Sequence, residues 1–475
     1  MIPTIALTVY SLLLVLFAIK QLGASPITMA TGVLAASFVA LLLAPLSYYP
    51  LSTDAALVLA AGMTSMVAVG LAPRRTGASH PPLQAKNRPS AAVISSHANK
   101  SARGGLLLLI VLILVVLTAV LLGYRAFVSG ISEATNATFS QLTLEEVRRA
   151  QNTGARGGGA LALLGSLGPL LGCLGLYGAA RHSRVFLIGP LVALAIALQN
   201  PSRLNSISLL VTLVAFWLYL RAGQGKVAHE LPFPDRPRTQ PGSSSRPSVG
   251  RAKIGGRSSP GWSRRKAILV GILAAGGALT LFNVVGNALG KSASTAAGFP
   301  AYDWPAWTLS PVFYFTGSYP ALTVAMSNDT SPYEPGTSFF SVLRLAAVFD
   351  PSIRPPETIA QYSSIPVPFN LYSGFGQVYF DVGFLGLVVV FGGLGMLLQR
   401  LHVAALRGHL PSIWAVSTLT SVVLALPQGF VLFNLDVTVR LLVGVGMFVA
   451  LGRNRRGRES PRLGQVPTRL RGLPA

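Results

Sequence analysis

The amino-acid sequence predicts an all-α polytopic integral membrane protein. Of its 475 residues, 51% are hydrophobic and only 11% are charged, a composition too apolar for a water-soluble globule. Apolar runs long enough for spans of about 20 residues recur along the chain and alternate with polar segments. Such runs are expected to be helical, because the bilayer interior offers no water to backbone N–H and C=O groups. The single cysteine, Cys173, excludes an internal disulfide.

Eleven membrane spans are expected from the apolar runs. The first run has no basic segment before it and no small-residue cleavage signal after it, so it is predicted to be a retained span rather than a signal peptide. Spans five to seven are short or contain Gly and Pro, which leaves open a re-entrant segment or a miscount there. The predicted spans are residues 4–19, 27–44, 55–71, 106–122, 160–178, 185–198, 205–220, 267–289, 382–398, 411–426 and 437–451.

Polar segments divide these spans into blocks. Residues 72–103 and 221–266 are rich in Pro, Ser, Gly and Arg and contain few large apolar side chains, so they are predicted to be disordered basic linkers that contact anionic lipid headgroups or have no role of their own. The predicted organisation is spans one to three in 1–71, the linker 72–103, spans four to seven in 104–220 with an external loop at 123–159, the linker 221–266, span eight at 267–289, a large external loop at 290–381, spans nine to eleven in 382–451, and a basic tail at 452–475.

The distribution of charge predicts the orientation of the chain. If residues 72–103 are cytoplasmic, 29 of the 38 Lys and Arg residues lie on the cytoplasmic side, and eleven of the 14 acidic residues lie on the other side. The positive-inside rule then predicts an external N-terminus and a cytoplasmic C-terminus. The same distribution argues against a nucleic-acid partner despite the net charge of +24, because the basic residues lie in loops between apolar runs rather than on one folded face.

The first external loop contains the sequence TFSQLTLEEVRRAQNTG. Thr143 and Glu146 have the spacing of a capping box, in which each side chain bonds the other residue's backbone N–H. This spacing predicts a short surface helix that carries Arg148 and Arg149. The two arginines are either part of a solvated amphipathic helix or candidates for ligand binding.

The second external loop, residues 290–381, is long enough to form a small domain. It begins with a group of aromatic residues, and residues 316–326 are predicted to form a helix that lies on the membrane or dips into it. The sequence SFFSVLRLAAVFD follows, in which Arg344 sits beside one apolar helical face. That face consists of Phe339, Phe340, Leu343 and Ala347.

The residues available on the external side limit its chemistry. All six histidines fall on the cytoplasmic side, and the chain has neither an Asp-x-Asp motif nor a close Cys/His cluster, so neither an external metal site, a cofactor nor a Ser-His-Asp triad is expected. The external cations are mainly arginines, whose planar guanidinium binds phosphate oxygens at two points. This inventory suits metal-independent glycosyl transfer from a polyprenyl-diphosphate donor, in which arginines stabilise the leaving group and a carboxylate takes a proton.

Two further arginines join the candidates for substrate binding. Arg203 lies in the predicted turn QNPSR between spans six and seven, where it either binds substrate or anchors a helix end. Arg440 lies near the outer end of the last span, four residues after Asp436. That spacing places both side chains on one helix face, so the two either form a structural pair or belong to a site.

Residues 365–385, IPVPFNLYSGFGQVYFDVGFL, run from a polar and aromatic segment into a long apolar helix. Asp381 is predicted at the start of that span, where it caps the helix, acts as a base, or does both. This segment resembles the one that follows the large external loop in Wzy-type O-antigen and oligosaccharide repeat-unit polymerases, and with residues 314–322 the resemblance covers roughly 300–395. Its motif residues are Asn370, Tyr372, Asp381, Gly383 and Gly386.

The resemblance implies a membrane glycosyltransferase that polymerises polyprenyl-diphosphate-linked oligosaccharide repeat units on the outer face of the bacterial plasma (inner) membrane. Expected partners are that lipid-linked oligosaccharide, membrane lipids, and the flippase and chain-length regulator of the same pathway. Asp381 is the first choice for the base and Arg344 for a donor-diphosphate contact. Expected substrate-binding residues are Arg148, Arg149, Arg203, Arg440, Asn370 and Tyr372.

Two other functions fit the same layout. An O-antigen-ligase-like transferase would pass finished glycan to another acceptor, but such ligases use an external histidine that this chain lacks in the predicted topology. A flippase or transporter of lipid-linked oligosaccharide would need no catalytic residues. It would more usually place charges at mid-span or show repeated halves, and the sequence shows neither.

Overall fold

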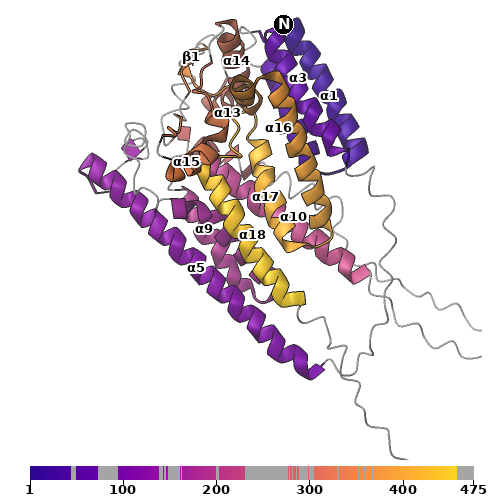
Figure 1. The fold of residues 1–475 in the computed structure, drawn as a ribbon, viewed down its shortest axis with the longest axis vertical. Helices are drawn as coiled ribbons and strands as arrows, with labels where there is room; N and C mark the ends of the chain where they lie inside the picture. Colours follow the sequence, from indigo (N-terminus) through magenta and orange to yellow (C-terminus); the bar gives the residue numbers. More distant parts are fainter. Residues whose placement is uncertain are drawn as a thin grey trace, which may run out of the picture.

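The computed structural model is almost entirely helical in the part of the chain that it describes (Figure 1). The described residues are 1–43, 50–72, 95–138, 143, 146–147, 161, 163–198, 203–229, 276–277, 279–280, 282–284, 286–287, 298, 304–328, 331–350, 352–356, 360–365 and 368–456.

Eight helices in the described part are long and apolar enough to cross a membrane, which confirms the predicted all-α membrane fold. Ten of the eleven predicted spans coincide with a described helix, two of them with shorter apolar helices, and the span at 267–289 lies largely outside the described residues. The long helices are α1 (Ile2–Leu22), α2 (Pro26–Leu43), α3 (Thr53–Gly70), α5 (Ser95–Thr135), η4 with α8 (Leu163–Leu167 and Gly168–Arg181), α10 (Arg203–His229), α16 (Gly374–Leu406) and α18 (Leu435–Arg456); the shorter ones are η5 with α9 (Arg184–Leu187 and Ile188–Leu198) and α17 (Leu410–Leu424).

Several helices extend further than predicted. The 41 residues of α5 correspond to about 60 Å of helix against a hydrocarbon core of about 30 Å. Residues 95–103 were predicted to be disordered linker and residues 123–135 were predicted to be external loop, but both belong to this helix. The helix is long enough to extend beyond the hydrocarbon core, so the predicted side of the membrane for residues 123–135 stays a prediction. No proline interrupts the 41 residues, so nothing in the sequence ends the helix at either membrane surface.

Two hydrophobic cores hold the bundle together, and α17 contributes to both. The first core joins α1–α3 to α16 and contains Phe38, Phe375 and Phe391. The second joins α5, α8, α10 and α18, and its largest member is the fully buried Trp414 of α17. α16 also reaches the second core through Ala405. The bundle therefore consists of two packed groups of helices that α16 and α17 connect.

The segment between residues 304 and 373 gathers at the end of the bundle where Met1 lies (Figure 1). It contains α13 (Ala306–Thr316), α14 (Ser318–Ser327), the 3-10 helix η6 (Thr337–Phe339), α15 (Phe340–Phe349), and the antiparallel strands β1 (Ser363–Ser364) and β2 (Pro368–Phe369). The predicted helix around Arg344 is confirmed as α15, although Phe339 of the predicted apolar face belongs to the preceding η6.

The helix predicted at residues 316–326 is α14, and its side chains are packed against the protein. Tyr319 is fully buried, its hydroxyl hydrogen-bonds Ser37 at 2.6 Å, and its ring centre lies 4.8 Å from that of Phe38. The buried side of α14 therefore covers part of α2, and the predicted contact of this helix with the membrane stays a prediction.

The helix that carries Asp381 begins earlier than predicted. α16 begins at Gly374, where Ser373 caps it by accepting a hydrogen bond from the Gly376 N–H at 3.1 Å. Phe375 is fully buried in the first core, so the aromatic segment before Asp381 is helical and packed. The helix is interrupted at Gly383, whose φ of 70° and ψ of −175° are non-helical.

Candidate functional site

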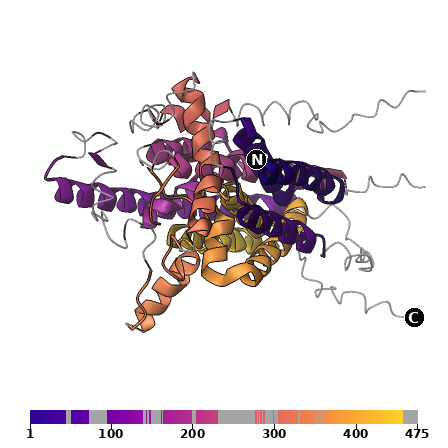
Figure 2. The ribbon, with the colours of Figure 1, turned by 90° about the horizontal axis from the view of Figure 1, so that it is seen from above.

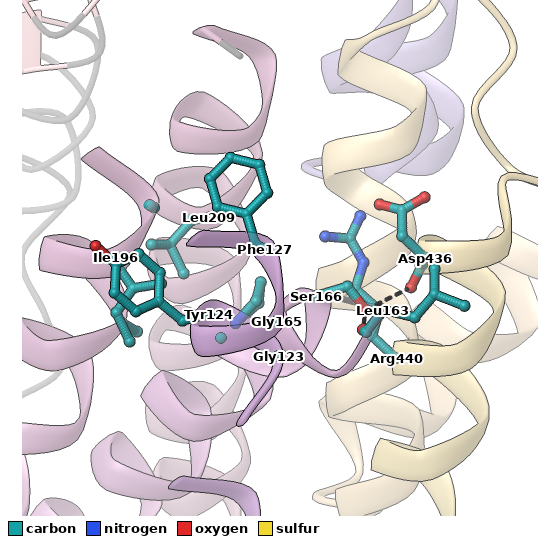
Figure 3. A pocket seen from close by; sticks show the side chains of 14 residues that line it. Gly123, Tyr124, Phe127, Leu163, Gly165, Ser166, Ile196, Leu209, Asp436 and Arg440 are labelled. Carbon is teal, nitrogen blue, oxygen red and sulfur yellow. Dashed lines mark hydrogen bonds between the residues drawn. The ribbon is translucent and has the colours of Figure 1, made fainter. Parts of the chain in front are cut away.

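A cavity of about 250 Å³ lies between α5, the η4–α8 segment, α9, α10 and the first two turns of α18 (Figure 3). α18 begins at the end of the bundle that carries α15, because the N–H of Ser341 donates a 3.0 Å hydrogen bond to the carbonyl of Phe433, two residues before α18. The cavity therefore lies toward that end. Its lining residues are Gly123, Tyr124, Phe127, Leu163, Gly165, Ser166, Gly168, Pro169, Ala193, Ile196, Ala197, Leu209, Asp436 and Arg440.

Arg440 is the cationic residue of this lining. Its side chain is only 7% exposed, and its Nε has no hydrogen-bond partner in the described part of the chain. Asp436 precedes it by one helical turn, and the close-up shows both side chains at the cavity (Figure 3). The carboxylate of Asp436 attracts the guanidinium electrostatically. A buried N–H without a partner is unfavourable, so the cavity offers a donor to a ligand that carries a hydrogen-bond acceptor.

Close backbone contacts shape the walls of the cavity. A Cβ at Gly123 of α5 would overlap the backbone nitrogen of Gly165, so α5 can approach η4 this closely only with glycine at that position. The Ser166 hydroxyl donates to the carbonyl of Leu163 at 2.6 Å and lies 3.4 Å from the carbonyl of Asp436, which joins η4 to α18. Segments far apart in sequence thus meet around Arg440.

Three of the predicted arginines lie partly or wholly outside the described residues. Arg203 is the first residue of α10, but its side chain is not described, and Arg148 and Arg149 are not described at all. The capping box that precedes the last two is confirmed. Thr143 N–H donates to Glu146 Oε2 at 2.7 Å, and Glu146 N–H donates to Thr143 Oγ1 at 3.3 Å.

Asp381 caps a different element from the one predicted. Its Oδ1 accepts the Gly336 N–H at 3.0 Å and its Oδ2 accepts the Ser338 N–H at 2.5 Å, so it holds the start of η6 rather than the start of α16. The prediction of a cap for its own span is wrong, because the helix already begins seven residues earlier. Asp381 is partly buried and does not line the Arg440 cavity.

Arg344 belongs to the helix that Asp381 helps to anchor. η6 continues directly into α15, where Arg344 is exposed, with its guanidinium carbon 5.8 Å from the centre of the Phe340 ring. One short segment, from Gly336 to Arg344, thus connects the Asp381 contact to Arg344. The sequence had predicted only that both residues belong to the same external loop. Neither residue is brought to the cavity that contains Arg440.

Tyr372 is a buried structural contact of the 304–373 segment. Its hydroxyl donates to the carbonyl of Gln361 at 2.6 Å and lies 2.8 Å from Ser363 Oγ, while its ring packs edge-on against Tyr333 at 5.6 Å. Burial raises the pKa of both tyrosines above the ordinary value, so both stay neutral at physiological pH. Asn370 is half-buried beside β2.

Sequence reasoning missed most of the cavity. Arg440 and its spacing from Asp436 were recognised, but Tyr124, Ser166 and Gly165 were not, because no local pattern connects segments more than 40 residues apart.

In the described residues no group of three or more His, Cys, Asp and Glu side chains could hold a metal ion. No family model, curated protein or solved structure matches this chain.

Proposed function

We propose that this protein is a glycosyltransferase that joins polyprenyl-diphosphate-linked oligosaccharide repeat units on the outer face of the plasma membrane. The observation that carries the proposal is Arg440, a buried guanidinium with an unbonded Nε in the lining of the cavity. A diphosphate oxygen supplies the acceptor that the Nε lacks. Arg203, the first residue of α10, is a further proposed contact, and Arg344 lies at the same end of the bundle outside the cavity lining.

The size of the cavity supports a headgroup rather than a whole oligosaccharide as its occupant. Its volume of about 250 Å³ is below the roughly 300–1,000 Å³ of pockets that enclose drug-sized ligands. One diphosphate with its attached sugar ring is the proposed content, and the remaining sugars extend toward the 304–373 segment. Tyr124 and Phe127 provide aromatic surface for the ring.

The proposed reaction needs one base and one stabilised leaving group. The acceptor hydroxyl gives its proton to a carboxylate, its oxygen attacks the anomeric carbon of the donor, and the bond from that carbon to the diphosphate oxygen breaks. The electron pair leaves with the diphosphate, whose added charge an arginine stabilises. Asp436 is the proposed base if the sugar is transferred inside the cavity, because it lines the cavity beside Arg440. Asp381, the base expected from the sequence, lies outside that lining and is the proposed base if the transfer occurs at the level of η6.

The test uses purified full-length protein in lipid vesicles supplied with polyprenyl-diphosphate-linked oligosaccharide. We expect longer lipid-linked glycan to form in the absence of any other protein. Movement of the substrate across the bilayer without new glycosidic bonds would indicate a flippase instead, and transfer of glycan only to a different acceptor would indicate a ligase. Either result would contradict the proposed polymerase.

Arg440→Lys tests the proposed diphosphate contact in the same assay. Lysine keeps the charge but loses the planar two-point donor, and loss of one positioned donor lowers a rate by on the order of 10²- to 10³-fold. Arg400→Lys is the matched control, because Arg400 is exposed near the C-terminal end of α16, away from the cavity. Equal activity of the two variants would show that Arg440 does not contact the diphosphate.

A further inference from the structure

α15 leaves a broad apolar face uncovered by protein. Val342, Leu345 and Phe349 are 53%, 59% and 83% exposed. Their spacings of three and four residues place them on one side of a helix with 3.6 residues per turn. On the other side, Leu343 and Ala347 are half-buried against the protein. An exposed side of this kind is unfavourable in water and indicates contact with an apolar medium.

Hydrogen bonds at its start fix α15 relative to two membrane helices. Ser341 is joined to the carbonyl of Phe433 just before α18, and Asp381 of α16 holds the backbone of Gly336 and Ser338. The helix therefore cannot move far from the level at which α18 begins. Seen from above, the orange segment that includes α15 reaches out sideways from the bundle (Figure 2).

The uncovered face continues an apolar surface of α16. Val382, Phe384 and Leu385, which directly follow Asp381, are 40%, 52% and 77% exposed on a helix that is long and apolar enough to cross a membrane. Because Asp381 also anchors the segment leading into α15, the two apolar surfaces belong to neighbouring parts of the molecule. Lipid that covers the α16 surface can therefore extend to α15.

The charge on α15 fits the same environment. Arg344 is exposed and adjoins Leu345, about 100° around the helix from it. A cation at the edge of an apolar helix face lets the apolar side chains enter the acyl region while the charge stays among the phosphate groups. A water-exposed surface helix has no need of three large apolar side chains on its outer side.

We propose that α15 is an interfacial helix that lies along the outer boundary of the phospholipid bilayer. Val342, Leu345 and Phe349 enter the acyl region, and Arg344 contacts the phosphate layer. This inference does not depend on glycan transfer, since it follows from exposure and anchoring alone. It places Arg344 at the depth occupied by the phosphates of any lipid-linked ligand.

The test is spin-label accessibility in the full-length chain. Single cysteines at 342, 345 and 349, introduced into a Cys173→Ala background, carry a nitroxide, and the protein is placed in nanodiscs of phosphatidylethanolamine and phosphatidylglycerol. We expect oxygen, which concentrates in the acyl region, to relax all three labels more strongly than a water-soluble nickel chelate. Ser352, exposed beyond α15, is the matched control at which the nickel chelate should dominate.

Two results would overturn the proposal. Nickel dominance at all three positions, equal to that at residue 352, would place α15 in water. Shielding of the labels from both reagents would mean that protein, such as a second copy of this chain, covers the face. Labels at these positions should not disturb folding, because the three side chains make up the exposed side of the helix.

Discussion

Asp381 holds the backbone of a neighbouring segment with both carboxylate oxygens, yet it remains able to act as a base. Each carboxylate oxygen has more than one lone pair, so a hydrogen bond from Gly336 or Ser338 does not exclude a further proton or donor. The anchoring and the proposed chemistry are therefore compatible. A test of the proposed base must keep the anchoring hydrogen bonds as far as it can. Losing one hydrogen bond to a charged group lowers the stability of the fold by about 1.5–3 kcal/mol by itself.

Asp381→Asn keeps one carbonyl acceptor for η6 but cannot take a proton at neutral pH. If Asp381 is the base, we expect this variant to lose on the order of 10²- to 10⁴-fold in the rate of glycan transfer. The measurement is the initial rate of glycan transfer in vesicles, with Asp436→Asn measured alongside. A larger loss of rate in Asp436→Asn than in Asp381→Asn would assign the base to the cavity.

At the scale of helices, the contact between α3 and α16 depends on small residues at the crossing. A Cβ at Gly395 of α16 would overlap the backbone carbonyl of Met66 in α3, whereas a Cβ at Gly393 would meet nothing within 4 Å. Without water in the bilayer interior, helices associate through this kind of close packing. A larger side chain is therefore expected to destabilise the protein at Gly395 but not at Gly393, although the two positions are only two residues apart.

Gly395→Leu should separate α3 from α16 and destabilise the first core, since overpacking of a fitted interior typically costs about 1–3 kcal/mol. Gly393→Leu, at an exposed position, is the matched control and should leave stability nearly unchanged. Thermal unfolding of the purified proteins in one detergent provides the comparison. Equal unfolding temperatures for both variants would show that α3 and α16 do not pack closely at Gly395.

Sequence reasoning worked where the physics is local. The capping box at Thr143 and Glu146 and the helix around Arg344 each depend on residues within about two helical turns, and both were predicted correctly. Sequence reasoning failed where tertiary packing decides. Phe375 is buried in the core and α16 begins before Asp381, and the Arg440 cavity needs several separate segments.

At the scale of the whole molecule, the described helix ends that border the predicted cytoplasmic segments lie at one end of the bundle (Figure 1). The start of α5 and the ends of α10 and α18 lie away from Met1 and the 304–373 segment (Figure 1). These helix ends adjoin the basic linkers 72–103 and 221–266 and the basic tail. This arrangement agrees with the prediction that all three basic segments lie on the same side of the membrane, which the positive-inside rule identifies as the cytoplasm.

Reporter fusions test that sidedness in cells. Fusions within 72–103 and 221–266 should report the cytoplasm, and a fusion near Ser331 should report the outside, because 29 of the 38 basic residues lie on the first side. An opposite result for even one linker would reverse the assignment of the segment that carries Arg344. The outer-face location of the proposed reaction would then be wrong.

The interruption of α16 at Gly383 predicts how deep this helix lies in the bilayer. Non-helical backbone is tolerated where water reaches it or protein buries it, but not where lipid surrounds it, and Gly383 is exposed. From Gly383 to Leu406 the helix measures about 36 Å, somewhat longer than the hydrocarbon core of about 30 Å. We therefore expect the break to mark the membrane surface, with residues 383–406 crossing the lipid and the first turns of α16, including Asp381, in contact with water.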